Sequence, residues 1–74
     1  MTLNTTQVLE ALRANPGAYV VHNAGTYRLK NADGTDMVKT DGGRTYFLEP
    51  SYHMMDDLMD AGRLKKDGQK YRLA

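Results

Sequence analysis

The segment from Ser51 to Leu73 limits the possible folds of this 74-residue chain more than any other part of it. Its first half carries apolar residues at three- and four-residue spacing, which predicts an amphipathic helix. This apolar stripe consists of Tyr52, Met55, Leu58 and Met59, with Met54 beside them. Ser51 can cap the first turn, and Gly62 suits the left-handed residue that ends a helix. The stripe must be covered by another element of the same domain.

The second half of this segment has the pattern of a β-hairpin. Asp67-Gly68 separates two short runs and favours a type I′ turn between two strands. In the second run, apolar Tyr71 and Leu73 alternate with basic Lys70 and Arg72, so we expect one apolar and one basic side. The segment therefore predicts a helix, a glycine stop and a C-terminal hairpin.

Residues 1–15 predict another helix. Asn4 is a candidate cap, and Gln7 lies three residues later, at the spacing of a capping box. Leu3 and Val8 stand at the positions of a hydrophobic staple. The apolar side is formed by Val8, Leu9 and Leu12, with Ala11. Asn15-Pro16-Gly17 ends the pattern.

Residues 18–49 predict short strands joined by tight turns. Tyr27 and Leu29 alternate with Arg28 and Lys30, which is the pattern of a strand with one apolar face. Further strands are predicted at 19–22, weakly around Met37-Val38, and at 45–48, separated by glycine-containing turns. We expect an antiparallel meander and leave open whether it has three or four strands. The fold class is then α+β: an N-terminal helix, the meander, a second helix and a C-terminal hairpin, in one domain over residues 1–74.

Composition limits where such a protein can act. The chain has no cysteine, which fits a reducing compartment and excludes disulfides and thiolate zinc sites. No apolar run approaches eighteen residues, and no signal-peptide pattern opens the chain. We therefore expect a cytoplasmic protein with no membrane segment.

Charge is unevenly distributed, although the net charge is only +1. Residues 51–60 contain three acids and no base, which gives −3, and residues 61–74 contain five bases and one acid, which gives +4. An acidic helix face is thus followed directly by a basic hairpin. Opposite charges placed side by side orient a binding partner more than they add affinity.

Catalytic and metal-binding patterns are weak. Ser51 is the only serine, and it lies two residues from His53 on the predicted helix, where side chains do not face each other. His53, Asp56, Asp57 and Asp60 share one helical face and could in principle hold a divalent ion. One helix rarely supplies a complete ligand shell, so we interpret these residues as a solvated acidic face. We expect no enzyme activity, no metal site and no cofactor.

Residues 58–73, LMDAGRLKKDGQKYRL, resemble the recognition helix and wing of winged-helix domains. The resemblance implies that residues 51–61 form a recognition helix and residues 63–72 form a wing. It also implies binding to duplex DNA. The chain departs from the family's pattern in having predicted strands at 18–49 and aspartates on the exposed helix face.

Two functions follow from these patterns. The first is a non-catalytic protein-binding domain, such as a small regulator or inhibitor, whose partner contacts His53, Asp56, Asp57 and Asp60 together with the basic hairpin. The alternative is a winged-helix-like DNA-binding transcriptional regulator that uses Arg63, Lys65, Lys66, Lys70 and Arg72. A homodimer through an open sheet edge is a further possibility.

Overall fold

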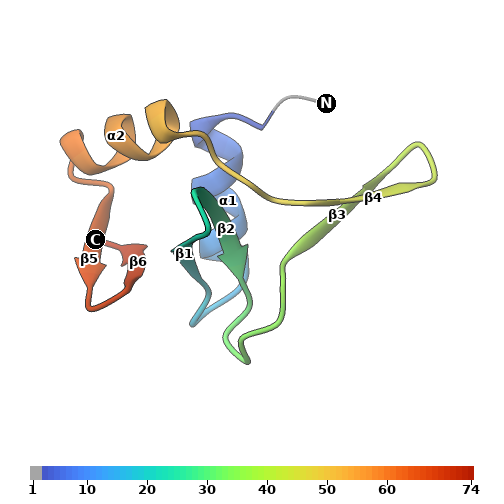
Figure 1. Cartoon of the computed structure of the whole chain (residues 1–74), viewed down its shortest axis with the longest axis horizontal. Coiled ribbons are helices and arrows are strands. Elements are labelled where there is room, and N and C mark those ends of the chain that lie inside the picture. Colours follow the sequence, from blue (N-terminus) through green and yellow to red (C-terminus); the bar gives the residue numbers. More distant parts are fainter. Residues whose placement is uncertain (1–2) are drawn as a thin grey trace.

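The computed structural model describes residues 3–74 and contains two helices and six strands (Figure 1). In chain order they are α1 (Thr5–Ala14), β1 (Tyr19–Asn23), β2 (Thr26–Lys30), β3 (Val38–Asp41), β4 (Arg44–Phe47), α2 (Tyr52–Asp60), β5 (Leu64–Asp67) and β6 (Lys70–Leu73). The predicted α+β class and order of elements are confirmed. No helix within residues 3–74 is long and apolar enough to cross a membrane.

Four strands form the main sheet, in the order β2-β1-β6-β5, and all neighbours are antiparallel. β1 is central: Val20 pairs with Leu29 of β2 on one side and with Tyr71 of β6 on the other. The C-terminal hairpin is therefore an extension of the sheet that β1 and β2 begin. Figure 1 shows α1 behind β1 and β2, so one face of the sheet is covered by helix.

The segment 18–49 has four strands, which settles the number that the sequence left open. They do not all belong to one sheet, because β3 and β4 form a separate two-stranded sheet. This sheet is attached to β2 at its base, where the Leu29 amide donates to the Leu48 carbonyl at 2.9 Å and the Met37 amide donates to the Leu29 carbonyl at 3.0 Å.

The core lies between the helices and the main sheet. Alternate residues of the strands point into it, as the period of two requires. Its fully buried side chains are Val8, Val20, Leu29 and Met55, joined by Leu12, Leu58 and Leu64. Both helices thus bury the stripe that the sequence predicts, with one exception described below.

The ends of α1 and α2 form as predicted. Asn4 and Gln7 make the capping box, with Asn4 Oδ1 accepting from the Gln7 amide at 2.8 Å and Gln7 Oε1 accepting from the Asn4 amide at 2.9 Å. Ser51 Oγ accepts from the Met54 amide at 3.2 Å. Gly62 has a φ of 71° and its amide donates to the Met59 carbonyl, while the Arg63 amide donates to the Leu58 carbonyl. These two bonds form a Schellman motif, which turns the chain into β5.

Tyr52 is the exception to the predicted apolar stripe, because it is 52% exposed. Its ring packs edge-on against Tyr27 and His22 at the surface. Its hydroxyl donates to the Gly25 carbonyl at 3.0 Å and lies 2.9 Å from His22 Nε2. The polar end of the tyrosine finds these partners only at the surface, so Tyr52 joins the start of α2 to the β1–β2 turn.

Candidate interaction surfaces

The exposed face of α2 carries the four residues that the sequence assigned to a partner. His53, Asp56, Asp57 and Asp60 are all exposed, because Met55 and Leu58 occupy the opposite, buried side of the helix. Within residues 3–74 no group of three or more histidine or acidic side chains is placed to hold a metal ion. This acidic face is available to a partner.

The main sheet has a second face, opposite to the helices, which we call the open face. Residues that alternate with the core positions point to it. From the strand register, its basic members are Arg28, Lys30, Lys65, Lys70 and Arg72. Tyr19 lies among them and is only 9% exposed, since Lys70 Nζ stands 4.4 Å from its ring centroid and Arg72 Cζ 5.4 Å from it.

The five predicted DNA-contacting bases are therefore divided. Lys65, Lys70 and Arg72 share the open face, whereas Lys66 pairs with Tyr71 and belongs to the other face. Arg63 precedes β5 and lines a hollow of about 430 Å³ between α1 and α2, together with Arg13. The acidic face of α2 and the open face point away from the core in different directions, because each lies opposite its own buried residues.

Arg28 and Lys30 belong to the open face, and the sequence interpretation did not include them among the candidate contacts. Their alternation with Tyr27 and Leu29 was visible, but only the pairing of β1 with both β2 and β6 places them beside Lys70 and Arg72. Lys30 Nζ donates to Asp36 Oδ1 at 2.6 Å, and Arg28 lies 3.7 Å from Asp36 and 3.4 Å from Glu49. The hydrogen bond from Lys30, aided by both positive charges, lowers the pKa of Asp36.

Asp36 and Glu49 reduce the positive charge of the open face. Arg72 also has an acidic neighbour, with its Nε 3.4 Å from Asp67, and its Nη1 donates to the Gly17 carbonyl at 3.3 Å. Among the described residues, Lys65 and Lys70 make no ion pair within 4 Å. The open face is thus moderately basic, with two lysines uncompensated.

The two-stranded sheet of β3 and β4 is the third surface. We call it the arm: β3, the Gly42–Gly43 turn and β4. All eight of its strand residues are exposed, and Figure 1 shows it extending away from the body on the side opposite β5 and β6. Gly42 and Gly43 have φ values of 60° and 80°, which fit the type I′ turn of a two-residue hairpin loop.

The two faces of the arm differ in chemistry. One face carries the cross-strand pairs Val38–Phe47 and Thr40–Thr45, which are uncharged. The other carries Lys39–Tyr46 and Asp41–Arg44. Phe47 is 49% and Val38 48% exposed, although the guanidinium of Arg28 lies 4.3 Å from the centroid of the Phe47 ring.

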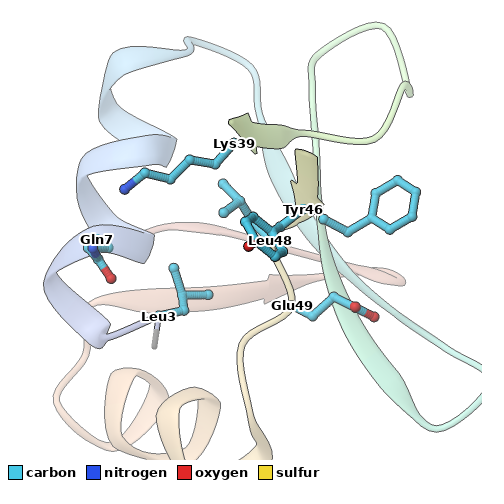
Figure 2. A pocket seen from close by; sticks show the side chains of 7 residues that line it. Leu3, Gln7, Lys39, Tyr46, Leu48 and Glu49 are labelled. Atoms are coloured by element: carbon cyan, nitrogen blue, oxygen red, sulfur yellow. The ribbon is translucent and has the colours of Figure 1, made fainter. Parts of the chain in front are cut away.

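A shallow groove lies between α1 and the base of the arm (Figure 2). It has a volume of about 260 Å³ and is lined by Leu3, Gln7, Lys39, Tyr46, Phe47, Leu48 and Glu49. Figure 2 shows Lys39 extending from β3 toward α1 across this groove. The groove is open and small, so it suits one or two side chains of a partner better than a substrate or cofactor.

Comparison with known proteins gave no match: no protein-family model, curated protein or solved structure is significantly similar to this chain. The chemistry of the three surfaces is therefore the basis for a functional assignment.

Proposed function

We propose that this chain is a non-catalytic, protein-binding domain, a small cytoplasmic regulator or inhibitor, and that the arm is its principal contact element. One observation carries the proposal. Of the four large hydrophobic side chains that are exposed within the described residues, three belong to the arm: Val38, Tyr46 and Phe47. Exposed apolar groups gathered on one element are typical of an interaction site.

The arm contributes less to the stability of the fold than the helices and the main sheet do. None of its strand residues is buried in the core, and a lone two-stranded hairpin is at best marginally stable in water. An aromatic residue at the centre of a protein interface often carries much of the binding energy. Phe47, held against Arg28 at the base of the arm, is the residue we expect to act in this way.

Features elsewhere in the molecule support a binding role over catalysis. Ser51 Oγ is engaged in capping α2, and His22 Nε2 lies against the Tyr52 hydroxyl. The acidic face of α2, with His53, Asp56, Asp57 and Asp60, remains a candidate second contact. It would steer a partner that carries a basic patch.

This proposal can be tested by placing a photo-crosslinking amino acid at position 47 of the full chain. The labelled protein is expressed in the cells that naturally produce the protein. We expect one discrete cross-linked protein, identified by mass spectrometry. The same label at position 13, an exposed residue of α1, is the matched control and should not yield that product. No product at position 47, or the same products at both positions, would count against the arm as a contact element.

DNA binding is the second candidate function, and it is favoured by one observation. Strand register brings Lys65, Lys70 and Arg72 onto one face with Arg28 and Lys30. In this mode of binding the open face contacts phosphates. A winged-helix mode would also bring the acidic face of α2 to the duplex, where its aspartates would be repelled by the phosphates. Lys65→Ala and Lys70→Ala should then each weaken binding.

Fluorescence anisotropy of a labelled duplex, at about 50 and 200 mM salt, distinguishes this candidate from the first. Binding through a few phosphate contacts falls steeply with salt. Reversal of the three aspartates of α2 should strengthen binding to DNA but weaken binding to a basic protein partner. No binding at the lower salt concentration would eliminate the DNA candidate.

A further inference from the structure

We propose that the arm pairs with the arm of a second copy of this chain, through the outer edge of β3, to form an intermolecular antiparallel sheet. The inference rests on the proposed function, because it names one partner for the same arm. Both outer edges of the arm are unpaired among the described residues, and an exposed strand edge is a ready template for another strand.

The hairpin turn determines which backbone groups of β3 are free. In a two-residue loop the flanking residues bond to each other, so Asp41 pairs with Arg44 and Lys39 pairs with Tyr46. The residues between them, Val38 and Thr40, then direct their amide and carbonyl groups to the outer edge. The side chains of Thr40 and Thr45 support this assignment, since their hydroxyl oxygens approach to 3.4 Å as in a closely spaced, non-hydrogen-bonded pair.

Charge selects one register for two antiparallel β3 strands. Two β3 strands can form hydrogen bonds only in registers that set outward-directed residues opposite each other. Three such registers lie near the middle of β3, and in them the residue that faces its own copy is Lys39, Thr40 or Asp41. The first sets Lys39 opposite its own copy, and the third does the same for Asp41, so like charges meet. The register centred on Thr40 sets Lys39 of each copy opposite Asp41 of the other. These pairs are of the non-hydrogen-bonded kind, in which side chains lie closest.

The shape of the arm permits this register. Antiparallel pairing places the two bodies at opposite ends of the new sheet, and the arm extends clear of its own body (Figure 1). The register sets Val38 of one copy opposite Gly42 of the other, so the tip that approaches each body carries no side chain. The outer edge of β4 cannot pair with its own copy through opposite charges, because β4 contains the base Arg44 but no acid.

Sedimentation equilibrium of the full chain tests the pairing, at about 50 mM salt and from about 10 µM to 1 mM protein, a range that covers weak dimers. We expect the unchanged chain to dimerise. Lys39→Asp and Asp41→Lys should each weaken dimerisation about tenfold or more, because each sets like charges opposite at both contacts. An equimolar mixture of the two variants restores both opposite-charge pairs, so it should dimerise again.

Lys65→Asp on β5, the outer strand of the main sheet, is the matched control and should dimerise like the unchanged chain. Circular dichroism confirms that each variant is folded. A chain that stays monomeric at the highest concentration, single variants that dimerise normally, or a mixture that does not recover would each overturn the proposal.

A single thiol tests the register independently, because the chain contains no cysteine. Facing residues of a hydrogen-bonded antiparallel pair have Cα atoms about 5.5 Å apart, within the range of a disulfide. Thr40→Cys should therefore form disulfide-linked dimers faster than Thr45→Cys, and equal rates would overturn the register. A monomeric chain that still cross-links another protein at position 47 would refute self-pairing and leave the proposed function intact.

Discussion

At the residue scale, Asp36 shows how one side chain adds to the backbone hydrogen bonds that attach the arm to the main sheet. It accepts from Lys30 of β2 at 2.6 Å and lies 3.7 Å from Arg28, so it holds the start of the arm against the main sheet. Lys30 and Asp36 also form an isolated β-bridge. The hydrogen bond from Lys30 lowers the pKa of Asp36, so the ionised form is preferred in the folded state.

The first prediction is a pH dependence of stability. Because the folded-state pKa of Asp36 lies below the unfolded value of about 3.9, its stabilising contribution is complete above that value and is lost as pH falls through the folded pKa. We expect Asp36→Asn to reduce the fall in unfolding free energy between about pH 5 and pH 2. Urea unfolding across this range measures the effect. Asp56→Asn on the acidic face is the control, and an equal reduction there would contradict the prediction.

At the element scale, the helices and hairpins are each closed by local interactions. The capping box of Asn4 and Gln7 begins α1, and the Schellman motif around Gly62 ends α2. The arm differs from the other elements, because its own turn and cross-strand pairs hold it together while its strands bury no side chain in the core. We therefore expect single substitutions in α1 and in the arm to have different effects on unfolding.

The second prediction concerns the start of α1. Asn4→Ala removes the acceptor of the Gln7 amide and should lower the unfolding free energy by about 1 kcal/mol. Asn4→Ser keeps a capping oxygen and should retain most of that stability. Urea unfolding followed by circular dichroism measures both variants. If both variants lost the same unfolding free energy, the helix cap would not be the contribution of Asn4 to stability.

The third prediction concerns the arm. Gly43 has a φ of 80°, a conformation that a β-branched side chain strongly disfavours, so Gly43→Val should open the turn of the arm. Amide hydrogen exchange in β3 and β4 should then accelerate, while exchange in β1 and β6 stays unchanged. Equal acceleration in the main sheet would mean that the arm and body unfold together.

At the scale of the whole molecule, β1 unites the fold by pairing with both β2 and β6. The hairpin of β1 and β2 and the C-terminal hairpin thereby share one sheet, and both helices bury their apolar sides against one face of it. A core of this size supports a net stability of only about 3–5 kcal/mol. One large core truncation is therefore enough to unfold the chain, whereas changes on the arm are not.

The fourth prediction compares these two sites. Leu29 is fully buried, and Leu29→Ala should cost about 2–5 kcal/mol, leaving much of the protein unfolded at 25 °C. Phe47→Ala removes a larger side chain from a half-exposed position and should change stability by about 0.5 kcal/mol or less. Thermal unfolding of the two variants makes the comparison. A large loss for Phe47→Ala would show that the arm serves folding and would remove the main argument for its role in binding.

Sequence by itself determined the features that depend on neighbouring residues. Both helices, their caps at Asn4 and Ser51, the stop at Gly62 and the turns of the first two hairpins follow from spacing and backbone preference over a few residues. The predicted Asp67-Gly68 type I′ turn was wrong by one residue: Asp67 pairs with Lys70, so Gly68 and Gln69 form the loop, and only Gly68 has a positive φ. The helical period also predicted the buried sides of α1 and α2. Tyr52 was misplaced, because the period identifies a face of the helix but cannot show that the helix extends beyond its core at that point.

Only the tertiary structure decided which strands pair and which surfaces result. The pairing of β1 with β6 joins residues about fifty positions apart, and a period of two says nothing about which strand is the neighbour. For the same reason the sequence could not place Arg28 and Lys30 beside Lys70, or separate the arm from the main sheet. The candidate surface shifted from the acidic helix to the arm, because exposure depends on what the rest of the chain covers, and that is determined by contacts distant in sequence.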